Sequence, residues 1–109
     1  MRLQELGEKL ELKSVTKVSD RDVTGVYISD MVSDVIANAK AGDLLVTVQI
    51  HNNVIAAANL VDICGIVVTQ DKLPTEDVVR MAEKANITIF STGLNRWQMA
   101  TRLYEAGIR

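Results

Sequence analysis

The sequence predicts a single α/β domain, residues 1–109, with a parallel or mostly parallel sheet of about five strands covered by helices. Short apolar runs typical of buried strands recur at residues 44–50, 66–69 and 88–91. Each run is followed by turn or capping residues and then by helical periodicity. This alternation predicts parallel strands joined by right-handed crossovers. The first strands lie outside the rhythm, so a mixed sheet is the alternative.

The N-terminal part predicts a helix and two strands. Leu3, Leu6 and Leu10 recur at spacings of three and four, which predicts a short amphipathic helix over residues 2–10. Val15 and Val18 predict a short edge strand, and residues 24–28 predict a second strand.

A helix is predicted after this second strand, because Ser29 and Asp30 are favourable N-cap residues. It ends near Lys40 and Gly42. Its predicted apolar stripe consists of Met31, Val32, Val35, Ile36 and Ala39.

The remaining helices follow the three apolar runs. Asn52 or Asn53 is predicted to cap a helix over residues 54–62. Pro74, with Thr75, Glu76 and Asp77 after it, predicts an acidic helix start. Gly93 predicts a turn and Asn95 a cap for the last helix. The predicted core face of that helix consists of Trp97, Ala100, Leu103, Tyr104 and Ile108.

Composition argues against several classes of protein. A net charge of -2 offers no electrostatic reason to propose a nucleic acid or an anionic membrane as partner. No apolar run approaches the roughly 20 residues of a membrane span, and the charged N-terminus does not resemble a signal peptide. The single cysteine, Cys64, cannot form an internal disulfide, which is typical of a reducing compartment. We therefore predict a cytoplasmic protein.

The helix over residues 54–62 is apolar nearly all round, and such a helix needs cover on two sides. In a small domain a second subunit supplies that cover, so a homodimer is predicted. The predicted interface consists of Val54, Ile55, Ala58 and Val61. The alternative is that the alanines simply tolerate exposure.

Polar residues follow each of the three predicted strands, at the edge where parallel α/β sheets bind ligands. Helix N-termini there suit a phosphate or carboxylate. The candidate ligand-binding residues are Gln49, His51, Asn52 and Asn53 after the first strand, Thr69, Gln70 and Asp71 after the second, and Ser91, Thr92 and Gly93 after the third. The alternative is that these residues are only caps and turn formers.

Catalysis and metal binding have weak signals. His51 is the only histidine, and as a general base it would need an orienting carboxylate, for which Asp71 is the nearest candidate. One histidine and one cysteine do not make a zinc site, and there is no phosphate loop or dinucleotide motif. We expect no metal, no cofactor and no enzyme activity. Trp97 is placed in the core, with stacking on a base or a partner as the alternative.

Four segments follow one another in a recognisable order. They are YISDMVSDV, AGDLLVTVQ, CGIVVT before a proline and an acidic helix start, and ANITIFST before a helix ending in YEAGI. With this order, residues 26–108 resemble the DRTGG domain, which is similar to the N-terminal domain of HPr kinase/phosphorylase. The resemblance implies a non-catalytic regulatory or accessory module. Such modules are attached to phosphotransacetylases and nucleotide-responsive pyrophosphatases, or are free-standing.

Two family elements are altered in this chain. The segment His51, Asn52 and Asn53 lies where the family has an Asp-Arg pair, and Thr69, Gln70 and Asp71 correspond to its Thr-Gly-Gly. The resemblance is therefore to a divergent, free-standing member.

The function predicted from the sequence is a ligand-sensing module that binds a nucleotide or another phosphorylated metabolite at the strand-exit edge. One alternative is an interaction module that docks on a larger metabolic enzyme. A second is a small phosphotransfer or hydrolytic enzyme that uses His51.

Overall fold

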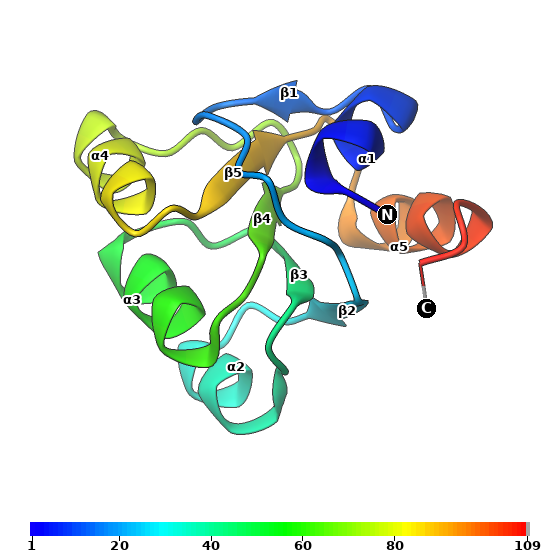
Figure 1. Ribbon diagram of the computed structural model, residues 1–109. Coiled ribbons are helices and arrows are strands. Elements are labelled where there is room, and N and C mark those ends of the chain that lie inside the picture. The colour runs from blue at the N-terminus through cyan, green and yellow to red at the C-terminus, as the bar shows by residue number, and fades with distance from the viewer. Residues whose placement is uncertain (109) are drawn as a thin grey trace.

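Five strands form one mixed sheet in the order β1-β5-β4-β3-β2 in the computed structural model, which describes residues 1–108 (Figure 1). The parallel strands are β2 (Gly25–Ile28), β3 (Asp43–Thr47), β4 (Gly65–Val68) and β5 (Thr88–Ser91). A two-residue strand, β1 (Lys13–Ser14), pairs antiparallel with β5. The predicted fold class is confirmed, with the sheet in its mixed form.

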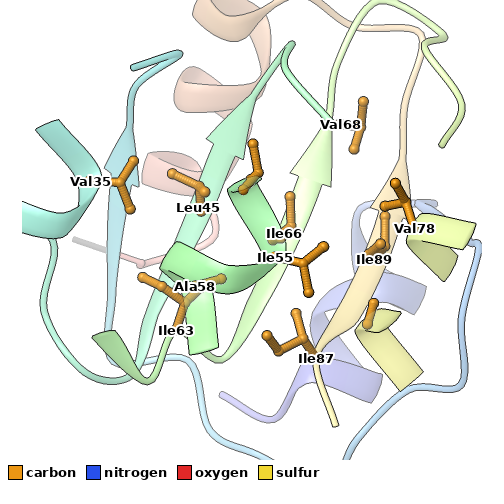
Figure 2. Close-up of a cluster of buried hydrophobic side chains, with 12 residues drawn as sticks. Val35, Leu45, Ile55, Ala58, Ile63, Ile66, Val68, Val78, Ile87 and Ile89 are labelled. Carbon is orange, nitrogen blue, oxygen red and sulfur yellow. The ribbon is translucent and has the colours of Figure 1, made fainter. Parts of the chain in front are cut away.

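Helices cover both faces of the sheet (Figure 1). On one face lie α2 (Val32–Asn38), α3 (Asn52–Val61) and α4 (Glu76–Lys84), over the apolar cluster drawn in Figure 2. On the other lie α1 (Leu3–Lys9) and α5 (Arg96–Glu105), over a second cluster that includes Phe90. Every residue of β3, β4 and β5 is buried, which explains why these strands read as apolar runs without alternation.

The edge strand β1 lies just before the predicted position. After it, Val15 N donates to Ile89 O at 2.8 Å, but Ile89 N donates to the hydroxyl of Thr16 at 2.9 Å. A side chain therefore replaces the backbone acceptor, and regular pairing ends before Val15 and Val18.

Strand β3 ends at Thr47, three residues before the predicted end at residue 50. The cause is Asp30 in the loop after β2. Its Oδ1 accepts a hydrogen bond from Val48 N at 2.8 Å, which takes that amide out of the ladder.

The predicted dimer interface on α3 needs correction. Val54, Ile55 and Ala58 are at most 4% exposed and lie in the core of the same chain, and Val61 packs against that core. The sheet and the neighbouring helices supply the cover that a second subunit was expected to provide. An interface on this helix would instead use its outward residues Ala56, Asn59 and Leu60.

Four predicted core side chains are exposed: Met31 by 62%, Ile36 by 45%, Trp97 by 79% and Tyr104 by 61%. Met31 precedes α2, and this short helix fully buries only Val35. Helix α5 buries Met99 and Leu103, and at 100° per residue Trp97 lies on the opposite side of the helix. The predicted stripe omitted Met99 and therefore misplaced Trp97.

Within residues 1–108, no helix has both the length and the apolar character required to cross a membrane.

Candidate functional site

The three predicted strand exits meet at one edge of the sheet. Thr69 N donates to Thr47 O at 3.0 Å, which joins the exits of β3 and β4. Asp71 N donates to Thr92 O, and Gln70 N to Leu94 O, both at 2.9 Å, which joins the exits of β4 and β5. The convergence expected from a parallel sheet is therefore present, and we call this region the carboxyl edge.

Asp30, at the exit of β2, is a fourth contributor that the sequence had suggested only as a helix cap. Its carboxylate accepts hydrogen bonds from Thr47 Oγ1 at 3.0 Å and from Val48 N at 2.8 Å, and it forms an ion pair with Arg96. It thus connects the exits of β2 and β3 with the start of α5. The sequence signal for this role was a polar residue shortly after the end of a strand, the same signal that marked the other exits.

Several predicted ligand-binding side chains are occupied by turn contacts. Thr69 and Ser91 are buried, and their hydroxyls point to Thr47 O at 3.5 Å and Lys72 O at 3.4 Å. The hydroxyl of Thr92 accepts from Leu94 N at 3.3 Å. For these three residues the structure favours the turn-forming role.

His51 is exposed, and its Nε2 lies 3.1 Å from Oε1 of Gln49. Asp71, its suggested carboxylate partner, lies instead beside Gly93, where an added Cβ would be 3.2 Å from Oδ2 of Asp71. His51 is therefore oriented by an amide, and the structure shows no acid-base pair between His51 and Asp71.

The first turn of α3 is open. The N-cap residue is His51 rather than an asparagine, and its side chain makes no capping bond. Val54 N and Ile55 N both donate hydrogen bonds to His51 O. The backbone N–H groups of Asn52 and Asn53 have no acceptor within residues 1–108. Asn52 and Asn53 are the first helical residues, and both are exposed. The turn therefore presents free N–H groups beside exposed amide side chains.

Two of the other helices that begin at this edge differ from α3. Helix α5 begins with a capping box in which Asn95 Oδ1 accepts from Gln98 N at 2.8 Å. Helix α4 carries Glu76 and Asp77 in its first turn. Carboxylates repel an anion and a capping box occupies the free amides, so the first turn of α3 is the most favourable anion position of the three.

Neither a metal site nor a reactive thiol is present at this edge within residues 1–108. No cluster of three or more metal-ligating side chains occurs within residues 1–108. Cys64 is buried at the other end of β4, and burial raises the pKa of its thiol to about 11.

Comparison with known proteins identifies the fold. Among solved structures, the chain is similar to the CBS and DRTGG domains of the regulatory region of a Clostridium perfringens pyrophosphatase, complexed with its activator diadenosine tetraphosphate. The TM-score is 0.75 at 20% identity, over 94% of this chain and 45% of the other, so this chain spans less than half of that neighbour. A search of curated proteins found no match.

The DRTGG domain model matches residues 8–106, which is most of the sequence and every strand. The match covers the exits after β3, β4 and β5, where two family elements were inferred to be altered. Together with the five-stranded α/β fold, it shows that the chain belongs to the DRTGG domain family.

Proposed function

We propose that this chain is a non-catalytic regulatory module that senses a nucleotide or another phosphorylated metabolite at the carboxyl edge. The observation that supports this most is the open first turn of α3, with two free amides and no acidic residue. A phosphate placed there would accept hydrogen bonds from the amides of Asn52 and Asn53 and gain from the helix dipole. Gln49 and His51 lie beside that turn and offer further donors.

The class of ligand is supported by the similar pyrophosphatase region, which was solved with a dinucleotide activator. Membership of the DRTGG family supports a regulatory role. At 20% identity, the similarity supports a shared fold but does not locate a binding site in this chain. The binding residues named here are therefore proposed from this chain's own geometry.

The absence of catalysis is proposed from the surroundings of His51. A general base needs an acidic or nucleophilic partner within hydrogen-bond reach, and His51 has Gln49. His51→Ala should therefore leave any phosphotransfer or hydrolysis measured with the protein unchanged. Loss of a measured activity in this variant would support the enzyme alternative.

The binding proposal is tested by thermal shift with a panel of nucleotides and phosphorylated metabolites. A compound at 100 times its dissociation constant should stabilise the fold by about 2.7 kcal/mol. Asn53→Asp places a carboxylate in the open turn and should abolish the shift caused by a compound that binds at this turn, whereas Asn59→Asp, exposed near the other end of α3, should leave that shift intact. The proposal fails if no compound shifts the melting temperature, or if both variants respond like the wild type.

Protein binding is a second candidate function, favoured by two exposed apolar residues on neighbouring helices. Leu60 on α3 is 72% exposed and Ile36 on α2 is 45% exposed. Exposed apolar residues such as Leu60 and Ile36 suit an interface, either in a homodimer or with a larger metabolic enzyme of the cytoplasm. Light scattering should show a dimer that Leu60→Glu converts to a monomer, and a monomeric wild type at high concentration would contradict the homodimer.

A further inference from the structure

A groove crosses the layer formed by α1 and α5, on the opposite face of the sheet from α3. It consists of two adjoining hollows, of about 360 and 220 Å³, which share Leu94 and Arg102. The larger hollow lies between the end of α1 and the exit of β5 and is also lined by Lys9, Leu10, Glu11, Thr92 and Gly93. The smaller one lies on the outer side of α5 and is also lined by Trp97, Gln98 and Thr101.

The charge of the groove favours an anion. Arg2, Arg21, Arg80 and Arg96 each form an ion pair with a carboxylate, but within residues 1–108 Arg102 forms none. Lys9 is likewise without an ion pair in this part of the chain, and both cations are exposed. Glu11 is the one carboxylate among the lining residues of the two hollows. The groove therefore holds two available cations against a single acid.

The far end of the groove is aromatic. Trp97 is 79% exposed, which is unusual because tryptophan is among the most buried side chains on average. It is held on a fixed helix start. Thr101 Oγ1 donates to Trp97 O at 2.9 Å, and the next residue, Gln98, belongs to the capping box.

Gln98 provides a polar group beside that ring. Its Oε1 accepts from Asn95 N at 3.0 Å, so the NH₂ group of the same amide remains able to donate into the hollow. A flat surface, an adjacent donor and two nearby cations match a planar heteroaromatic ring that carries a phosphate.

We propose that this groove is a second binding site, for a nucleoside monophosphate, with the base stacked on Trp97 and the phosphate between Lys9 and Arg102. The site does not depend on the proposed function at α3, because it lies on the other face of the sheet and uses none of the amides of the open turn. It includes two of the predicted ligand-binding residues, Thr92 and Gly93, as part of its lining.

The sole tryptophan of the chain reports directly on the site. AMP should quench the fluorescence of Trp97 in a saturable titration. Adenosine and ribose 5-phosphate, each lacking one half of the ligand, should both bind at least about tenfold more weakly than AMP. Arg102→Gln should weaken AMP binding by about tenfold, because it removes a charge-assisted hydrogen bond. Arg80→Gln, the same change on α4, should have no effect.

Three results would overturn the site. They are unchanged Trp97 emission at millimolar AMP, equal AMP affinity in the wild type and Arg102→Gln, and an emission maximum that moves with protein concentration alone. The last would show that a second copy of the chain covers Trp97. Asn53→Asp separates the two sites, since it should abolish binding at α3 and leave the AMP titration of Trp97 unchanged.

Discussion

Asp30 holds three segments of the carboxyl edge together, and a test follows at the scale of that residue. Asp30→Ala leaves Val48 N, the hydroxyl of Thr47 and the guanidinium of Arg96 without their acceptor. We expect the free energy of unfolding to fall by about 2 kcal/mol, as measured by urea denaturation. Asp20→Ala is the control, because Asp20 is 91% exposed in its ion pair and should cost clearly less. Equal losses would contradict the role of Asp30.

The resemblance to the family places Gln70 and Asp71 at the positions of the glycines in its Thr-Gly-Gly element. Their φ angles are 60° and 58°, in the left-handed region that glycine adopts without strain. The exposed Gln70 side chain makes no hydrogen bond within residues 1–108. Gln70→Gly should therefore raise the free energy of unfolding by about 1 kcal/mol. Lys72→Gly, at a position without positive φ, should lower it instead. A destabilised Gln70→Gly variant would show that the strain is absent.

At the scale of elements, α5 depends on its N-terminal capping box more than α4 depends on its cap residue. Asn95→Ala removes the bond to Gln98 N and should cost about 1 kcal/mol of stability, read from thermal unfolding. Thr75→Ala is the matched change on α4, where the cap residue makes no side-chain bond. Its cost should be smaller, and the reverse order would contradict the observed caps.

Helix α1 packs closely on β5 at Gly7. A Cβ at this position would lie 2.9 Å from Cε1 of the buried Phe90 ring. Alanine improves helix propensity by about 1 kcal/mol, but overpacking costs about 1–3 kcal/mol. We expect a net loss in urea denaturation of Gly7→Ala. In a Phe90→Leu background the same change should become neutral or favourable, and an unchanged cost there would show that Phe90 is not the cause.

At the scale of the whole molecule, the strand order predicts where the sheet opens. Strands β3 and β4 have a strand on each side and helices on both faces, whereas β2 has one neighbour and β1 has two residues. In native-state hydrogen exchange, the amides of β3 and β4 should exchange slowest and those of β1 and β2 much faster. Uniform protection across all five strands would contradict this order.

Much of the fold could be predicted because its signals are local. The predicted strand at residues 88–91 matches β5 residue for residue, and the acidic start of α4 lies at Glu76 and Asp77 as expected. The candidate site was predicted only in outline. The exits converge, but Thr69 and Ser91 proved to be buried turn residues, and Asp30 was recognised only as a cap.

Local sequence patterns were enough to predict the succession of strands and helices along the chain and the parallel core, because buried runs, caps and periodicity act within a few residues. The pairing of polar groups depends on the folded chain, which brings Asp30 to Thr47 and Arg96, and His51 to Gln49 rather than to Asp71. The folded structure also exposes Trp97 to solvent and places Met99 in the core. Most of these outcomes depend on which face of a helix packs against the sheet and on contacts between segments that are distant in the sequence. Local patterns do not encode either.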